Sequence, residues 1–150
     1  MKLVRIVATA ISVSCTLAVH AADGLVTVKS PHPPAETASR LEAAIKQRGL
    51  TLFARIDHAG AASSVGKTLR PTEVLIFGNA QTGTPFMACQ QSVGIDLPLK
   101  ALVWRDASGQ TWVGYNDPAW LARRHDAADC PVVANMAKAL AGLASAATAP

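Results

Sequence analysis

The stretch Leu99–Tyr115 reads LKALVWRDASGQTWVGY and points most directly to the fold. Two apolar, β-branched runs flank Asp-Ala-Ser-Gly-Gln, in which Gly109 suits the left-handed position of a three-residue hairpin turn. If Asp106 pairs with Gln110, Trp104 lies directly opposite Trp112 on one face of the sheet. The stretch therefore predicts an antiparallel β-hairpin.

Three further strands are expected before this hairpin, at residues 25–29, 50–57 and 73–77. The second alternates apolar and polar residues, which predicts one buried face, with Phe53 on the opposite face. The third is a continuous apolar run between Arg70-Pro71 and Gly78-Asn79 and suits a central strand.

Helices are expected at four places. Apolar spacing predicts a helix over residues 33–48, Thr84-Pro85 and Asp117-Pro118 each suit the start of a short helix, and Cys130-Pro131 opens another that continues through Leu143. Residues 59–66 are expected to form a loop or a weak turn, and the Ala-rich tail from Ala144 is expected to fray.

The element order predicts an α+β fold: strand, helix, four strands with a short helical insertion, then helix. We expect two layers, with an antiparallel sheet and its helices on one face, as a single domain over residues 22–146 followed by a frayed tail at 147–150. The hairpin leaves open whether the tryptophan pair or Val103, Val113 and Tyr115 face away from the helices. In either case the second sheet face is apolar, so a homodimer or a ligand is expected to cover it.

The amino terminus has the three parts of an export signal. Lys2 and Arg5 precede an apolar run of about 14 residues, and small residues at Val19 and Ala21 suit cleavage, so residues 1–21 are expected to be a cleavable signal peptide. The run is short of the ~20 residues that a membrane-spanning helix needs. The mature protein is expected to be periplasmic or secreted, with lipoprotein processing at Cys15 as the alternative.

Cleavage of the signal peptide would change the net charge and the number of cysteines in the mature protein. The formal net charge falls from +4 to +2, with Lys and Arg scattered along the chain, so no nucleic-acid-binding surface is indicated. Two of the three cysteines remain, Cys89 and Cys130, and a disulfide between them is expected in an oxidising compartment.

Several motifs together resemble the domain of unknown function 302 family across nearly all of the mature chain, in order. They are Phe53-Ala54-Arg55-Ile56-Asp57-His58, Arg70-Pro71-Thr72-Glu73-Val74-Leu75-Ile76-Phe77-Gly78-Asn79, Gly83-Thr84-Pro85-Phe86-Met87, Gly94-Ile95-Asp96-Leu97-Pro98-Leu99-Lys100 and Tyr115-Asn116-Asp117-Pro118. The resemblance implies a fold similar to the TATA-box-binding-protein-like class, and it implies no reaction. The chain departs from the family pattern at Ala80, where proline is common, and its two mature cysteines are not part of that pattern.

Polar residues at element ends suggest a candidate site. Asp57-His58 follows a strand, His125 ends a helix, and Asn116 ends the hairpin, so these side chains could converge as metal ligands or as an acid/base pair. The alternative is that Asp57 and His58 cap the loop that follows them. No two histidines have the i, i+4 spacing that builds a zinc site from one helix, so no metal site is assigned.

Thr84 is a weaker candidate. Residues 78–84 have the glycine spacing of a phosphate loop but lack its lysine, which excludes a nucleotide site. The amides from Thr84 onward would open a helix and could hold a carboxylate or phosphate. Turn geometry alone explains both glycines as well.

Four aromatic residues allow two interpretations: Phe53, Trp104, Trp112 and Trp120. They could line a site for a planar ligand such as haem, with His58 or His125 as an axial ligand, or they could form core and dimer contacts. The residues do not identify a cofactor.

We expect a non-enzymatic binding or interaction domain, a homodimer with a small-ligand pocket near Asp57-His58. The alternative is a hydrolytic or redox enzyme that uses His58 or His125 with Asp57. No nucleophile-base-orienter triad is visible from spacing, which favours binding.

Overall fold

Five antiparallel strands form one sheet in the computed structural model, which describes residues 23–150. The spatial order is β1-β5-β4-β3-β2, so β4 is the middle strand, and β3, expected to be central, is an interior strand between β4 and β2. The α+β class and the antiparallel sheet predicted from the sequence are confirmed. The strands span Leu25–Ser30 (β1), Thr51–Asp57 (β2), Thr72–Gly78 (β3), Leu99–Arg105 (β4) and Thr111–Asn116 (β5).

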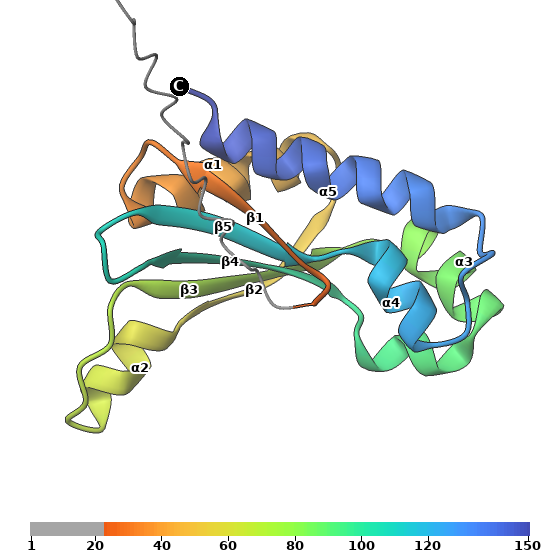
Figure 1. The fold of residues 1–150 in the computed structure, drawn as a ribbon, viewed down its shortest axis with the longest axis horizontal. Helices are drawn as coiled ribbons and strands as arrows, with labels where there is room; N and C mark the ends of the chain where they lie inside the picture. The colour runs from red at the N-terminus through yellow and green to blue at the C-terminus, as the bar shows by residue number, and fades with distance from the viewer. Residues whose placement is uncertain (1–22) are drawn as a thin grey trace, which may run out of the picture.

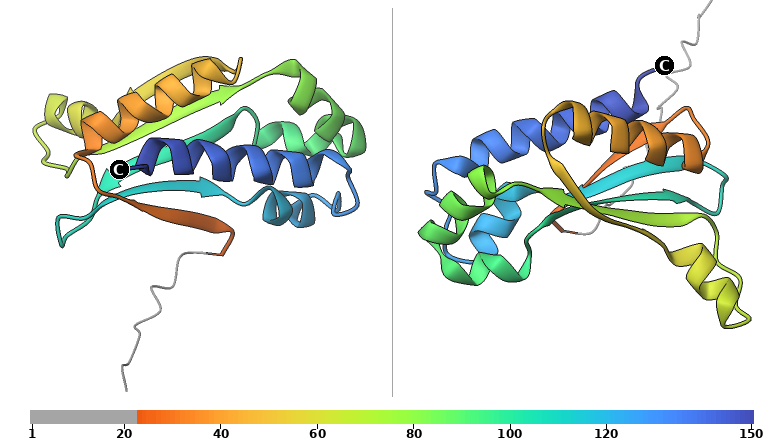
Figure 2. Two further views of the ribbon diagram at one scale, coloured as in Figure 1. Left: turned by 90° about the horizontal axis from the view of Figure 1, so that it is seen from above. Right: turned by 180° about the vertical axis from the view of Figure 1, so that it is seen from behind.

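Two long helices cover one face of this sheet, α1 (Pro34–Gln47) and α5 (Val132–Thr148) (Figure 1). Seen from above, they lie beside each other across the strands (Figure 2). The main core lies between the two layers, where the fully buried strand residues meet the apolar faces of both helices. It includes Leu41, Ile45, Leu75, Phe77, Val103, Val113, Leu140 and Leu143.

A second apolar cluster lies at one end of the sheet, under the start of α5. It is built by α3 (Ala80–Cys89), the 3-10 helix η1 (Gln91–Ile95) and α4 (Pro118–Arg124). Its fully buried members include Phe86, Val93, Leu121 and Met136. This cluster fixes the short helices against α5 and so shapes the site described below.

The hairpin forms as its sequence predicts. Trp104 pairs with Trp112 across β4 and β5, and Gly109 adopts a φ of +88°, a left-handed conformation that favours glycine. The tryptophans lie on the face away from the helices, because Val103 and Val113 are buried in the main core. Of the two arrangements that the hairpin sequence allows, the structure therefore has the one in which the tryptophan pair faces away from the helices.

The predicted single buried face of β2 is wrong. The pairing of β2 with β3 shifts between Leu52 and Ala54, which is a β-bulge at Phe53. An extra residue in one strand reverses the sides on which the following side chains point. Leu52 therefore packs toward the helices, whereas Ile56 lies on the open face and is 39% exposed.

Three helix boundaries differ from the prediction. α2 (His58–Ser64) forms where a loop or weak turn is expected, because the Asp57 carboxylate accepts a hydrogen bond from the amide of Gly60 and caps the first turn. α3 begins at Ala80, before Thr84, because Asn79 caps it by accepting a hydrogen bond from the amide of Thr82. α5 continues through the tail to Thr148, because Ala144 and Ala147 are buried.

Residues 1–22 lie outside the described part of the chain, and so do the cleavable signal at residues 1–21 and the lipoprotein alternative at Cys15. Between residues 23 and 150, no helix combines the length and the hydrophobicity needed to cross a membrane.

Candidate functional site

An apolar pocket with a cavity volume of about 400 Å³ opens beside α5 at the end of the sheet, and we call it the end pocket. The ends of β3 and β4 contribute Phe77 and Leu99, and the segment around η1 contributes Gly94, Leu97 and Pro98. The remaining lining residues are Leu50, Phe53, Gly78, Asn79, Ala80, Thr82, Gly83, Thr84, Met87, Met136, Ala139, Leu140 and Leu143.

The end pocket exists because the helix layer is incomplete at this end of the sheet. α1 stops at Gln47, and Gly49, with a φ of +69°, turns the chain back into β2. The adjacent sheet surface is bordered by α5 on one side and by α3 and η1 at the end (Figure 2). The unfilled space between them is the pocket.

The α3 wall of the end pocket is a helix with weak intrinsic stability. It contains Pro85, which cannot donate an amide hydrogen bond, and Gly83, which has low helix propensity. Tertiary contacts hold it instead, because Phe86 is fully buried in the second apolar cluster. The wall is thus positioned by its neighbours.

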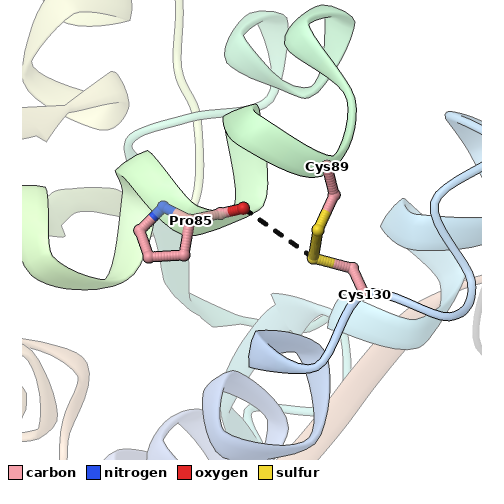
Figure 3. The surroundings of a disulfide bond; sticks show 3 residues. All are labelled: Pro85, Cys89 and Cys130. Atoms are coloured by element: carbon pink, nitrogen blue, oxygen red, sulfur yellow. Dashed lines mark hydrogen bonds between the residues drawn. A yellow bond between two sulfur atoms is a disulfide. The ribbon is translucent and has the colours of Figure 1, made fainter.

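A disulfide ties the end of α3 to the segment before α5. Cys89 and Cys130 are bonded, with their Cα atoms 6.0 Å apart, as expected from the sequence. Cys130 Sγ also lies 3.9 Å from the carbonyl oxygen of Pro85 (Figure 3). The covalent link fixes one wall of the pocket relative to the other.

The chemistry of the end pocket suits an apolar ligand. Its lining is mostly aliphatic and aromatic, with polar side chains only at Asn79, Thr82 and Thr84. Two methionines, Met87 and Met136, add flexible, polarisable groups that adapt to ligand shape. A volume of this size lies in the range of small-molecule sites.

A separate polar cluster joins η1 to α4. His125 Nε2 lies 2.6 Å from Asp96 Oδ2, and His125 Nδ1 lies 2.9 Å from Ser92 Oγ. Arg124 donates to the other oxygen of Asp96 at 3.1 Å. The histidine is nearly buried, whereas Ser92 is exposed. This chain of hydroxyl, imidazole and carboxylate can move a proton from the serine to the histidine.

Asp57 has a local structural role. Asp57 caps α2 by accepting from Gly60 N at 2.9 Å, which matches the capping alternative. α2 projects from the sheet at the end opposite to α4 (Figure 1), so His58 and His125 are not brought together. The carboxylate that pairs with His125 is Asp96, not Asp57.

The other sequence candidates are also dispersed. Asn116 is exposed at the end of β5, and among the five candidate ligand-binding residues only Thr84 lines the end pocket. Thr84 lies inside α3, so its amide does not begin a helix as predicted. Within residues 23–150, no group of three or more His, Cys, Asp or Glu side chains is arranged to hold a metal ion.

The four aromatic candidates occupy different places. Trp104 and Trp112 stack on the open sheet face, and Phe53 lines the end pocket. Trp120 belongs to α4, where Arg124 lies over its ring at 5.8 Å. They do not form one planar-ligand wall.

Sequence reasoning missed the end pocket and the Ser92–His125–Asp96 cluster. Spacing offers no signal for either, because Asp96 and His125 are 29 residues apart and belong to different elements. Phe53 is the sequence signal for the pocket, because a large apolar side chain on the polar side of an alternating strand indicates that other apolar groups contact it there.

Comparison with known proteins identifies relatives of this fold. The family model described as "Domain of unknown function DUF302" matches residues 26–143. A crystal structure of an uncharacterized conserved DUF302 protein from Bacillus stearothermophilus superposes with a TM-score of 0.76 at 25% sequence identity. The match covers 84% of this chain and 99% of that chain.

Curated relatives share a higher sequence identity over a shorter region. The fluoride-specific ion channel FluC 1 of Brucella suis biovar 1 (strain 1330) is 51% identical over 102 residues, which is 68% of this chain and 40% of that protein. The FluC 1 protein of Brucella abortus biovar 1 (strain 9-941) has the same identity over 68% of this chain and 38% of its own length. The chain thus spans about two fifths of these relatives.

Proposed function

Since the chain belongs to the DUF302 family, whose description assigns no reaction, we propose from its own geometry that it binds a small apolar molecule in the end pocket. The observation that carries this proposal is a cavity of about 400 Å³ with an almost wholly apolar lining. Apolar cavities are poorly hydrated and take up apolar molecules readily. A ligand is expected near Asp57-His58 from the sequence, and we propose the end pocket, at the other end of the sheet, as the binding site instead.

A neutral fluorescent probe tests this proposal. N-phenyl-1-naphthylamine should bind the purified domain with enhanced emission, and Ala139→Phe should weaken binding at least about tenfold by filling the pocket from α5. Ala141→Phe places the same side chain on the exposed side of the same helix and should leave binding unchanged. Equal binding by both variants would contradict the proposal.

We also propose that the domain is a homodimer, formed through the open sheet face. This face carries Ile56, Val74, Ile76, Leu102, Trp104 and Trp112, and among residues 23–150 of one subunit no helix covers it. α2 projects on the same side, followed by Val65 and Leu69, which are 71% and 48% exposed (Figure 1). We call α2 and the residues after it, through Leu69, the α2 arm. Its exposed apolar groups lie beside the apolar sheet face, and together they suit contact with a second copy of the chain.

The arm is important for the size of this interface. Five strands about 4.8 Å apart and about 22 Å long give a face of roughly 500 Å², whereas a standard interface buries about 800 Å² on each partner. Light scattering should give a dimer for the natural sequence and a monomer for Ile76→Glu, with Val65→Glu weakening association. A monomeric natural protein at high concentration would exclude this interface.

Export is proposed on the basis of the amino-terminal pattern, and the disulfide supports it because such bonds persist in oxidising compartments. Expression in a Gram-negative host followed by fractionation should place the protein in the periplasm. Mass spectrometry should give a mature chain that begins at Ala22. An intact Met1 in the cytoplasmic fraction would contradict this assignment.

A second candidate function is acyl-group hydrolysis at Ser92, and the serine–histidine–carboxylate chain is the observation that favours it. In such a step Ser92 Oγ attacks the ester carbonyl carbon while its proton passes to His125, and the protonated histidine gives that proton to the departing alcohol, which leaves the acyl group on Ser92. A water molecule that loses a proton to His125 then attacks this acyl group, and Ser92 takes up that proton as the carboxylic acid leaves. A fluorophosphonate probe should label Ser92 and lose its label in Ser92→Ala and His125→Gln. Unlabelled natural protein would remove this candidate.

Ion-channel activity does not enter the proposal. The name "fluoride-specific ion channel" belongs to the Brucella proteins, and this chain matches less than half of their length. This partial match supports only the statement that domains similar to this one occur as part of longer proteins.

A further inference from the structure

Arg48 places a positive charge beside the end pocket, where it contacts one of the lining residues without lining the pocket itself. It follows the last residue of α1 and donates from Nη1 to the carbonyl oxygen of Ala139 at 3.2 Å. Ala139 lines the pocket from α5, and Leu50, two residues after Arg48, lines it from the position just before β2. The guanidinium therefore contacts the lining segment of α5, and the chain after Arg48 leads directly into a second lining residue.

Gly142 allows the guanidinium to lie against α5. A Cβ atom at this position would come within 2.5 Å of Arg48 Nη2, so a larger residue would displace the side chain. Glycine inside a helix lowers helix stability relative to alanine. The close approach of Arg48 to α5 thus coincides with Gly142, a residue of low helix propensity inside that helix.

The charge of Arg48 is not neutralised locally. Across residues 23–150, the ion pairs include none between Arg48 and a carboxylate. No Asp or Glu is among the residues that line the end pocket. Lys100, the cation near Pro98, donates instead to the carbonyl oxygens of Asp96 and Pro98. The exposed guanidinium of Arg48 is therefore available to an anion beside the pocket.

We propose that the ligand of the end pocket is an amphipathic carboxylate, with its apolar body in the pocket and its head paired with Arg48. This inference rests on the proposed binding function and names its ligand class. A guanidinium presents donors in a planar fork that matches a carboxylate.

A pair of ligands that differ only in the head tests this inference. Decanoate and 1-decanol should both displace N-phenyl-1-naphthylamine from the natural protein. Arg48→Met should weaken decanoate about fivefold, the range of a solvent-exposed ion pair, and leave 1-decanol unchanged. Arg48→Lys should retain part of the preference, because it keeps the charge and loses the fork.

The matched control is Arg123→Met, which removes an exposed charge from α4 outside the pocket and should change neither ligand. Unchanged probe affinity in Arg48→Met shows that the variant is folded. If both ligands respond equally to Arg48→Met, or neither responds, the carboxylate assignment is wrong while the apolar pocket stands. If the probe itself does not bind the natural protein, the proposed binding function fails.

Discussion

Trp104 and Trp112 stack across β4 and β5, with ring centroids 6.3 Å apart and an interplanar angle of 17°. The indole nitrogen of Trp112 donates to Asp106 Oδ2 at 2.8 Å, which connects the aromatic pair to the hairpin turn. On the other side of Trp112, the Lys29 ammonium lies 5.5 Å from the ring centroid. The stacked pair therefore links the centre of the open face, the turn and the edge strand β1.

Gly114 makes room for this stack, and Gly114→Ala should destabilise the fold. An added Cβ would lie 2.8 Å from Trp104 Cζ3, so the ring must move from its partner. Overpacking of this kind costs about 1–3 kcal/mol of unfolding free energy. Urea denaturation measures it, and Gly83→Ala, whose Cβ would meet Leu97 at 3.7 Å, should not destabilise the fold.

Asp106 should titrate well below an ordinary aspartate. The hydroxyl of Ser108 and then the indole of Trp112 stabilise its carboxylate and lower the pKa of Asp106 to about 2. A lowered folded-state pKa contributes stability that is present above the unfolded value near 3.8 and is lost as pH falls toward 2.

The NMR titration of the Asp106 side-chain carboxyl carbon measures this pKa directly. A midpoint near 2 is expected in the natural protein, and Trp112→Phe, which removes the indole donor, should raise it. A midpoint near 3.8 in the natural protein would show that these hydrogen bonds do not form in solution.

The Cys89–Cys130 disulfide should contribute substantially to stability. It closes a loop over a sequence separation of 41 residues, for which the chain-entropy estimate is about 4 kcal/mol. The Cys89→Ser/Cys130→Ser double variant should lose about this much unfolding free energy and bind the neutral probe more weakly, because α3 forms one pocket wall. Full probe affinity in the variant would mean that packing of Phe86 alone positions α3.

The sequence predicts features that depend on neighbouring residues more successfully than features that depend on distant ones. The hairpin is specified by a short turn and two alternating strands, so its register and Gly109 conformation follow locally. The bulge at Phe53 does not follow, because β2 alone shows an unbroken alternation and only its pairing with β3 reveals the shift. One extra residue there reverses the exposure of Ile56.

The candidate site illustrates the same limit. The end pocket is made by the termination of one helix, the face of another and a proline-containing segment that packs at the sheet end, and no single segment encodes the space between them. The sequence indicates His125 as a candidate from its residue type and its position at the end of a helix. Its partners come from a distant segment, Ser92 from η1 and Asp96 from the position that ends η1. The cysteine pair was predictable because only two cysteines remain after the expected cleavage.

The α2 arm provides a final prediction, because its stability depends on one capping residue. No residue of α2 is buried, and Asp57 accepts a hydrogen bond from Gly60 N at 2.9 Å at its first turn. Loss of an aspartate cap costs about 1 kcal/mol of helix stability, and a short helix without buried contacts has little other stabilisation. Asp57→Ala should therefore unfold α2 locally.

Hydrogen exchange over residues 58–66 should become faster in Asp57→Ala, while exchange in β3 and β4 stays unchanged. Asp57→Asn retains a capping oxygen and should behave like the natural protein. If the arm contributes to the homodimer, Asp57→Ala should also weaken association without changing probe binding in the distant end pocket. Loss of probe binding in this variant would instead connect Asp57 to the ligand site, and would restore the interpretation of Asp57-His58 as binding residues.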